Sequence, residues 1–186
     1  MNILITVSVI VLIFAIGFLT YTMRDRLTKW QQALTALSLL FLTFFEFFRL
    51  GSVPGFFGDE AYAMYDSWAI AHYGIDRSLM HNAVYSLTSG GQSVLYEHLA
   101  APFMKIFGMN LAAFRFPMAL LTIISIIVLV YAIYRNKFNS NIVVGIAFTM
   151  STAQWFLMHC HWAMDCSVIA PMFILTIDFI LLGLTG

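Results

Sequence analysis

The sequence contains few charged residues: they make up 10% of its 186 positions, and nine Lys and Arg balance nine Asp and Glu. Hydrophobic residues, by contrast, make up 61%. A soluble domain of this length could not cover so much apolar surface, which excludes an ordinary soluble fold. No run of basic residues is present, which argues against nucleic acid as a partner. The chain is therefore predicted to be an integral membrane protein.

Cysteine is also scarce. Cys160 and Cys166 are too few for a disulfide framework, although one disulfide between them stays open. They share a short segment with His159, His161 and Asp165, but the spacing matches no standard zinc site. The sequence therefore predicts no metal site, and it leaves open whether a divalent metal assists the chemistry.

Long apolar runs predict about five transmembrane helices within a single domain that covers the whole chain. The predicted spans are 3–22, 31–50, 111–134, 141–158 and 167–184. The first span lacks the basic region of a signal peptide and its apolar run is too long for one, so it is expected to be retained. The predicted fold class is all-α integral membrane, with a long loop at 51–110.

The positions of basic residues predict the orientation of these spans. The link after the first span and the link after the third are basic, through Arg24, Arg26, Lys29, Arg135 and Lys137. Cytoplasmic loops are enriched in Lys and Arg, so both links should be cytoplasmic. The loop 51–110 contains more acidic than basic residues. It would then lie on the outer face of the plasma membrane, as would the N-terminus.

The loop 51–110 is too long for a simple connection and too aromatic to be disordered, so we expect it to be folded and functional. It opens with Gly58-Asp59-Glu60, and a helical period follows, which predicts a short helix in the membrane interface with Asp59 at its N-cap. A mobile turn is expected at 86–93. A second surface helix is expected at 94–107, with a break or bend at Pro102.

Two polar residues near the ends of the spans have more than one interpretation. Asp59 is either a helix cap or a catalytic acid. Arg115 either extends to the interface or binds a lipid phosphate, which its planar guanidinium suits. Asp178 lies deep in the fifth predicted span and needs a partner there. We expect that partner on further helices, supplied by a longer chain or by an oligomer.

Several of these features together resemble the membrane glycosyltransferases of the GT-C fold, in the protein O-mannosyltransferase and aminoarabinose-transferase branch (glycosyltransferase family 39). The resemblance begins with Gly58-Asp59-Glu60-Ala61-Tyr62 at the start of the outer loop. It continues with Val94-Leu95-Tyr96-Glu97-His98, then Ile106-Phe107-Gly108, then Ala113-Phe114-Arg115-Phe116-Pro117. Two departures are clear. This chain has Gly90-Gly91-Gln92-Ser93 where family members often have a Lys or His together with prolines, before the Leu-Tyr pair. Family members also have more membrane spans.

This resemblance implies that the chain is the N-terminal part of a glycosyltransferase, which could be inactive alone. The donor would be a polyprenyl-phosphate sugar and the acceptor would lie on the outer face. The implied catalytic residues are Asp59, Glu60 and Asp165, and the implied substrate-binding residues are Arg115, Tyr96 and His98. Expected partners are the lipid-linked donor and membrane lipids. Half of a transporter or channel, or a structural membrane subunit, stays open as an alternative.

The orientation can be tested by cysteine labelling. A cysteine introduced at Ser89 should react with a membrane-impermeant reagent added from the outside, because the loop that contains it is predicted to be external. Reaction only from the cytoplasmic side would contradict the predicted topology.

Overall fold

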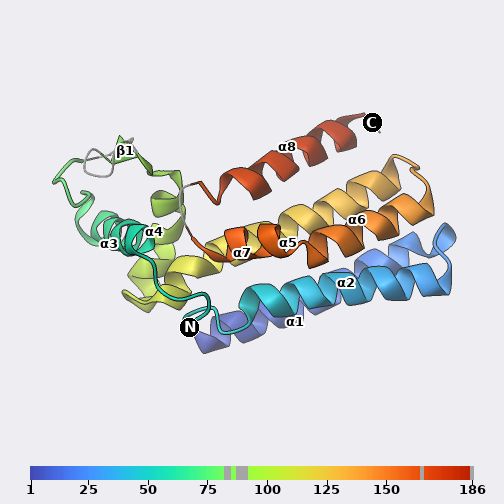
Figure 1. Cartoon of the computed structure of the whole chain (residues 1–186), viewed down its shortest axis with the longest axis horizontal. Coiled ribbons are helices and arrows are strands. Elements are labelled where there is room, and N and C mark those ends of the chain that lie inside the picture. Colours follow the sequence, from blue (N-terminus) through green and yellow to red (C-terminus); the bar gives the residue numbers. More distant parts are fainter. Residues whose placement is uncertain (82–84, 87–91, 164–165, 185–186) are drawn as a thin grey trace. The chain divides into compact units, whose positions relative to one another are not determined.

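The computed structural model describes residues 1–81, 85–86, 92–163 and 166–184, and most of them are helical (Figure 1). The first part of the chain forms α1 (Asn2–Thr22), the short 3-10 helix η1 (Met23–Asp25), α2 (Lys29–Phe47) and α3 (Gly58–Tyr73). A two-residue antiparallel pair follows, β1 (Tyr85–Ser86) with β2 (Gln92–Ser93). The remaining elements are α4 (Leu95–Phe107), α5 (Leu111–Arg135), α6 (Ser140–Thr152), α7 (Gln154–His161) and α8 (Ile169–Gly183).

Local sequence signals begin and end several of these helices. Before α2, Thr28 and Gln31 form a reciprocal capping box, in which the Gln31 side chain accepts from the Thr28 backbone N–H at 2.9 Å. The Asn110 side chain accepts from the backbone N–H of Ala113 at 2.9 Å and so caps α5. Gly74 ends α3 in the left-handed conformation, with φ 69°, where glycine carries no steric penalty.

Two helical segments are long and apolar enough to cross a membrane, Asn2–Asp25 and Leu111–Arg135. They agree with the first and third predicted spans. The fourth predicted span is not one helix, because α6 ends at Thr152 and α7 begins at Gln154. The fifth is α8, whose 15 residues rise about 22 Å, less than the roughly 30 Å of a bilayer core. The multi-span topology is therefore only partly supported.

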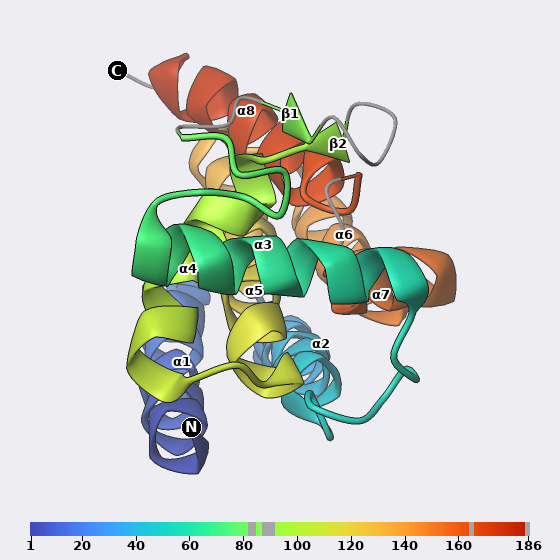
Figure 2. The same ribbon diagram turned by 90° about the vertical axis from the view of Figure 1, so that its left-hand side faces the viewer.

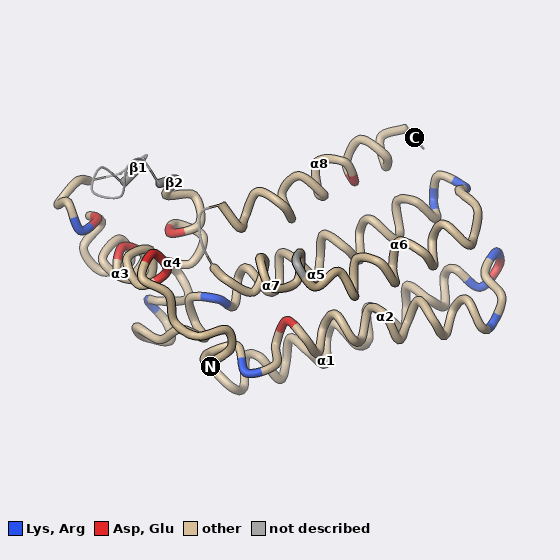
Figure 3. The backbone as a smooth tube through the Cα atoms, viewed as in Figure 1, with Lys and Arg blue, Asp and Glu red and all other residues tan. Residues whose placement is uncertain are grey.

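The chain divides into two compact units. Unit 1 contains Met1, Phe48–Leu120 and Met158–Ala170, and unit 2 contains Asn2–Phe47, Leu121–Leu157 and Pro171–Gly186. In unit 2, α2 packs against both α1 and α6. In unit 1, α3 packs against α4 (Figure 2). Charged residues gather in the links between helices and around α3 and α4, and the long helices are nearly free of them (Figure 3).

Two helices are present in the loop 51–110 as expected, α3 and α4, and their position at the membrane surface stays a prediction. Asp59 is not the N-cap of α3, because Phe57 has that position and Asp59 lies inside the first turn. Pro102 lies within α4 and does not interrupt it. Of the turn predicted at 86–93, the ends pair as β1 and β2, and 87–91 lie outside the described residues.

The buried side of α3 carries two acids as well as small and apolar residues. Its buried residues are Glu60, Ala63, Met64, Asp66, Ser67 and Ala69. The aromatic side chains of Tyr62, Tyr65 and Tyr73 are exposed. A helix that buries Glu60 and Asp66 needs cations within unit 1 to neutralise these two acids.

One of these cations is Arg77, which follows α3. Its backbone N–H donates to the Asp66 carboxylate at 2.8 Å, and its Nε lies 3.3 Å from the other carboxylate oxygen. The Arg77 guanidinium also lies over the Tyr62 ring, 4.5 Å from the centroid. Burial raises the pKa of Asp66, and the nearby Asp76 also raises it, while the contacts with Arg77 oppose the rise.

The raised pKa of Asp66 predicts a pH dependence of stability. Its carboxyl binds a proton more tightly in the folded than in the unfolded state, so its stabilising effect is lost as pH rises from 3.8 through the raised pKa. In Asp66→Asn this dependence is absent. The free energy of unfolding of the variant minus that of the wild type should therefore increase with pH across this window. A difference that stays constant, or falls, would contradict the assignment.

Candidate functional site

Unit 1 is organised around a buried ion pair between Arg115 and Glu60. Arg115 is in the first turns of α5 and Glu60 is in the first turn of α3, and both side chains are fully buried. The pair is bidentate: Nε and Nη2 of Arg115 each donate to one Glu60 carboxylate oxygen at 2.6 Å. This geometry matches the planar guanidinium to the planar carboxylate and gives the strong, charge-assisted form of the interaction.

The rest of the Arg115 guanidinium binds the loop that leads into α3. Nη1 lies within hydrogen-bond distance of three backbone oxygens, those of Leu50, Val53 and Pro54, at 3.2, 3.1 and 2.9 Å. Nη2 also donates to Gly55 at 3.5 Å. Because all five N–H groups have partners within the protein, none is left for a lipid phosphate. The role in phosphate binding that was inferred for Arg115 does not fit this arrangement.

Glu60 also reaches the segment that follows α7. The backbone N–H of Ala163 donates to its carboxylate at 3.3 Å. Nearby in sequence, the Trp162 ring lies 6.2 Å from that of Phe57, the N-cap residue of α3. Glu60 therefore connects three parts of unit 1.

Asp59 has a different environment from its neighbour. It is exposed, and it lies in the first turn of α3, where the partial positive charge of the helix N-terminus favours a carboxylate. The backbone that carries it is fixed through Glu60 on one side and the Arg115-bound loop on the other. Asp59 is thus an accessible carboxylate on a rigid base, which suits a group that must exchange a proton with a bound molecule.

The residues implied for substrate binding in α4 lie on different sides of that helix. Tyr96 is fully buried, and its hydroxyl donates to the backbone oxygen of Phe114, next to Arg115. Burial raises the pKa of Tyr96 well above its ordinary value, and the charge of Glu60 adds to the rise, so the hydroxyl stays protonated and donates. His98 is exposed, with Nδ1 3.0 Å from the Val94 oxygen.

The structure therefore brings Glu60, Arg115 and Tyr96 together, with Asp59 beside them and His98 at the surface. Asp165 lies outside the described residues. The described part of the chain contains no group of three His, Cys, Asp or Glu side chains that could hold a metal ion. Cys160 and Cys166, both described, are not joined by a disulfide.

No protein-family model, no curated protein and no solved structure matches this chain.

The different environments of Asp59 and Glu60 could not be predicted from the order of residues. Glu60 was expected to share the catalytic role, and nothing in the sequence indicated which loop atoms Arg115 would bind. One signal was present: an arginine between Phe114 and Phe116, in an apolar context, requires a buried counter-ion.

The ion pair predicts distinct effects of substituting the two adjacent acids. Glu60→Gln leaves the Arg115 charge buried without its counter-ion, which typically costs about 3–5 kcal/mol. The free energy of unfolding in detergent should fall by that order. Asp59→Asn, at the exposed neighbour, is the matched control and should leave stability nearly unchanged. Equal stability of the two variants would show that the buried pair does not contribute as described.

Proposed function

We propose that this chain is a membrane glycosyltransferase, or the N-terminal part of one, that moves a sugar from a polyprenyl-phosphate donor to an acceptor at the outer membrane face. The observation that carries the proposal is the pairing of an accessible acid, Asp59, with a buried acid, Glu60, that fixes its backbone. The motif segments that resemble the GT-C family contribute to this same cluster, through Glu60, Tyr96 and Arg115.

The exposed apolar surface of α1 supports placement of this helix in a bilayer. Only 17% of its most apolar stretch is buried, against 67% of the corresponding stretch of α5. Large side chains such as Ile3, Phe14 and Phe18 are 81%, 74% and 72% exposed. Water is a poor environment for such a surface, whereas lipid is a suitable one. The full proposal is a multi-pass protein of the plasma membrane with about five spans and the loop 51–110 outside.

The exposed aromatic side of α3 supports a position at the membrane surface. Tyr62, Tyr65 and Tyr73 are 55%, 44% and 62% exposed, and their rings belong to the class enriched at the level of lipid headgroups. Because Glu60 and Asp66 of α3 are buried, the helix can rest on lipid by its aromatic side. Asp59 would then lie near the bilayer surface, where the phosphate and sugar of a lipid-linked donor are located.

The proposed reaction is a direct displacement at the anomeric carbon of the donor sugar. The acceptor hydroxyl forms a bond to this carbon as the bond to the phosphate oxygen breaks. The hydroxyl proton passes to the Asp59 carboxylate, and the polyprenyl phosphate leaves with the bonding electron pair. Glu60 and Tyr96 hold the cluster in place and do not exchange protons with substrate. The role of Asp165 stays a prediction.

A second candidate, an ion-conducting or transporting subunit, is favoured by one observation. Asp178 in α8 is fully buried, and among the described residues neither of its carboxylate oxygens has a hydrogen-bond partner. Such acids often mark ion pathways in membranes. Binding of a polyprenyl-phosphate sugar and ion flux, both measured on the intact protein in liposomes, distinguish the two: binding without flux supports the transferase, and flux without binding supports the transporter.

The transferase proposal predicts that Asp59→Asn is a catalytic variant. The amide keeps the shape of the side chain but cannot accept the hydroxyl proton, so the transfer rate of the intact protein should fall by about 10²–10⁴-fold. The rate is measured with a labelled polyprenyl-phosphate sugar at saturating donor, alongside the thermal midpoint of unfolding.

The matched control is Asp25→Asn, which removes an exposed acid from η1 in unit 2. It should leave the rate unchanged. A rate for Asp59→Asn within a few-fold of wild type would show that Asp59 is not the base.

A further inference from the structure

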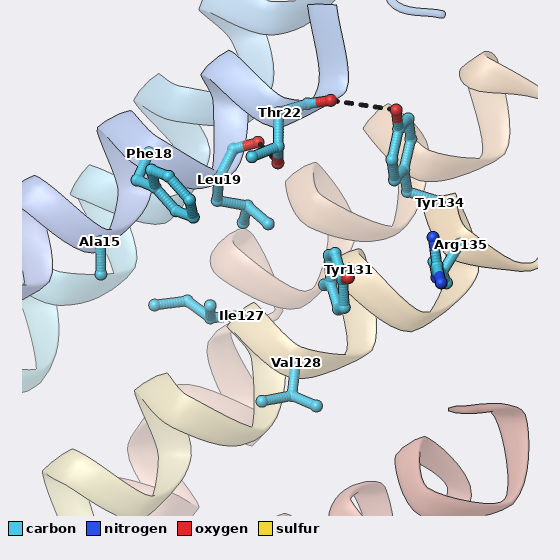
Figure 4. A pocket seen from close by; sticks show the side chains of 9 residues that line it. All are labelled: Ala15, Phe18, Leu19, Thr22, Ile127, Val128, Tyr131, Tyr134 and Arg135. Atoms are coloured by element: carbon cyan, nitrogen blue, oxygen red, sulfur yellow. Dashed lines mark hydrogen bonds between the residues drawn. The ribbon is translucent and has the colours of Figure 1, made fainter. Parts of the chain in front are cut away.

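A groove in unit 2 lies between α1 and the second half of α5 (Figure 4). Its volume is about 540 Å³. Ala15, Phe18 and Leu19 line it from α1, and Ile127, Val128 and Tyr131 line it from α5. These residues are apolar except for the phenol of Tyr131, so the groove suits a hydrocarbon chain.

One end of the groove is polar and cationic. Figure 4 shows Ala15 toward one end and Arg135 toward the other, with Thr22 and Tyr134 near the arginine. The Tyr134 hydroxyl donates to the Thr22 backbone oxygen at 3.0 Å, which ties the two helices together at this end. Arg135 also lines a second recess of about 410 Å³, together with Lys137. The apolar groove and the polar recess therefore meet at Arg135.

The other arginines near this end already have partners within the protein. Arg26 donates to the backbone oxygens of Tyr134 and Phe138 at 2.8 and 2.9 Å. Arg24 lies 3.7 Å from Asp25. Within the described residues, the side chain of Arg135 makes no hydrogen bond or ion pair, and it is exposed. It is the arginine of this end that is positioned to bind an anion from outside the chain.

We propose that this groove binds an anionic phospholipid, with one acyl chain between α1 and α5 and the phosphate at Arg135 and Lys137. The guanidinium can donate two parallel hydrogen bonds to a phosphate, and Lys137 adds a second positive charge. The groove runs about 11 Å along the helices, from the spacing of its lining residues. This is about a third of a bilayer core, so it would hold the part of the chain nearest the headgroup.

The site is at the end of α1 and α5 that carries the basic links, which the predicted orientation places on the cytoplasmic side. The groove belongs to unit 2, whereas the proposed transferase site around Asp59 belongs to unit 1, and the lipid proposal does not depend on sugar transfer. Basic pockets between membrane helices on this side are suited to anionic headgroups. A helix of a second copy is the main other occupant, and it would leave Arg135 without a counter-charge.

The experiment uses the full chain purified in mild detergent and native mass spectrometry, with phosphatidylglycerol and phosphatidylcholine added in equal amounts. Two cations at the headgroup should favour the anionic lipid on the order of tenfold. Arg135→Gln should remove most of this preference, whereas Arg24→Gln, a matched arginine outside the groove, should keep it.

A second pair of variants tests the acyl-chain part with all charges retained. Ala15→Phe fills the end of the groove remote from Arg135 and should reduce retention of phosphatidylglycerol. Val11→Phe, at a 59% exposed position of α1 outside the groove, should not.

Three results would overturn the proposal. Equal retention of the two lipids would exclude headgroup recognition. Equal behaviour of Arg135→Gln and Arg24→Gln would exclude Arg135. A stable dimer that is lost in Ala15→Phe and carries no lipid would assign the groove to a second copy of the chain.

Discussion

The bidentate contact between Glu60 and Arg115 joins parts of the chain that are 55 positions apart and removes two charges from solvent at the same point. Each charge would be costly to bury alone. The ion pair neutralises both charges and thereby holds α3 against the start of α5. The same guanidinium is within hydrogen-bond distance of the backbone oxygens of Leu50, Val53 and Pro54. These contacts fix the path of the link after α2. The packing of unit 1 depends on this contact.

The proposed chemistry depends on the same contact. Two neighbouring acids on one helical turn point in different directions, and the pairing of Glu60 leaves Asp59 accessible. A general base must be accessible and also fixed in position, and surface carboxylates are seldom fixed. The buried partner meets the second requirement. A base that acts on a lipid-linked donor must also lie near the lipid headgroups, and the exposed aromatic side of α3 suits that position.

The sequence predicted the helical class, the helices α3 and α4, and five spans, of which two have the length and apolarity to cross a membrane. Each of these features follows from composition or local periodicity. The division of the apolar segment 141–158 into α6 and α7 was not predicted, because hydropathy does not register a single residue with extended backbone, such as Ala153. Asp59 was expected at the N-cap, which Phe57 occupies. The roles of Glu60 and Arg115 depend on long-range pairing, which residue order alone does not determine.

Glu60 and Arg115 act as one unit, and a double-mutant cycle on Glu60→Gln and Arg115→Gln measures how strongly the two side chains are coupled. The free energy of unfolding is measured for the wild type, both single variants and the double variant. Because each single variant leaves a buried charge unpaired, the double variant should lose much less stability than the sum of the single variants, with a coupling energy toward the upper end of about 0.5–3 kcal/mol. Additive losses, with a coupling energy near zero, would contradict it.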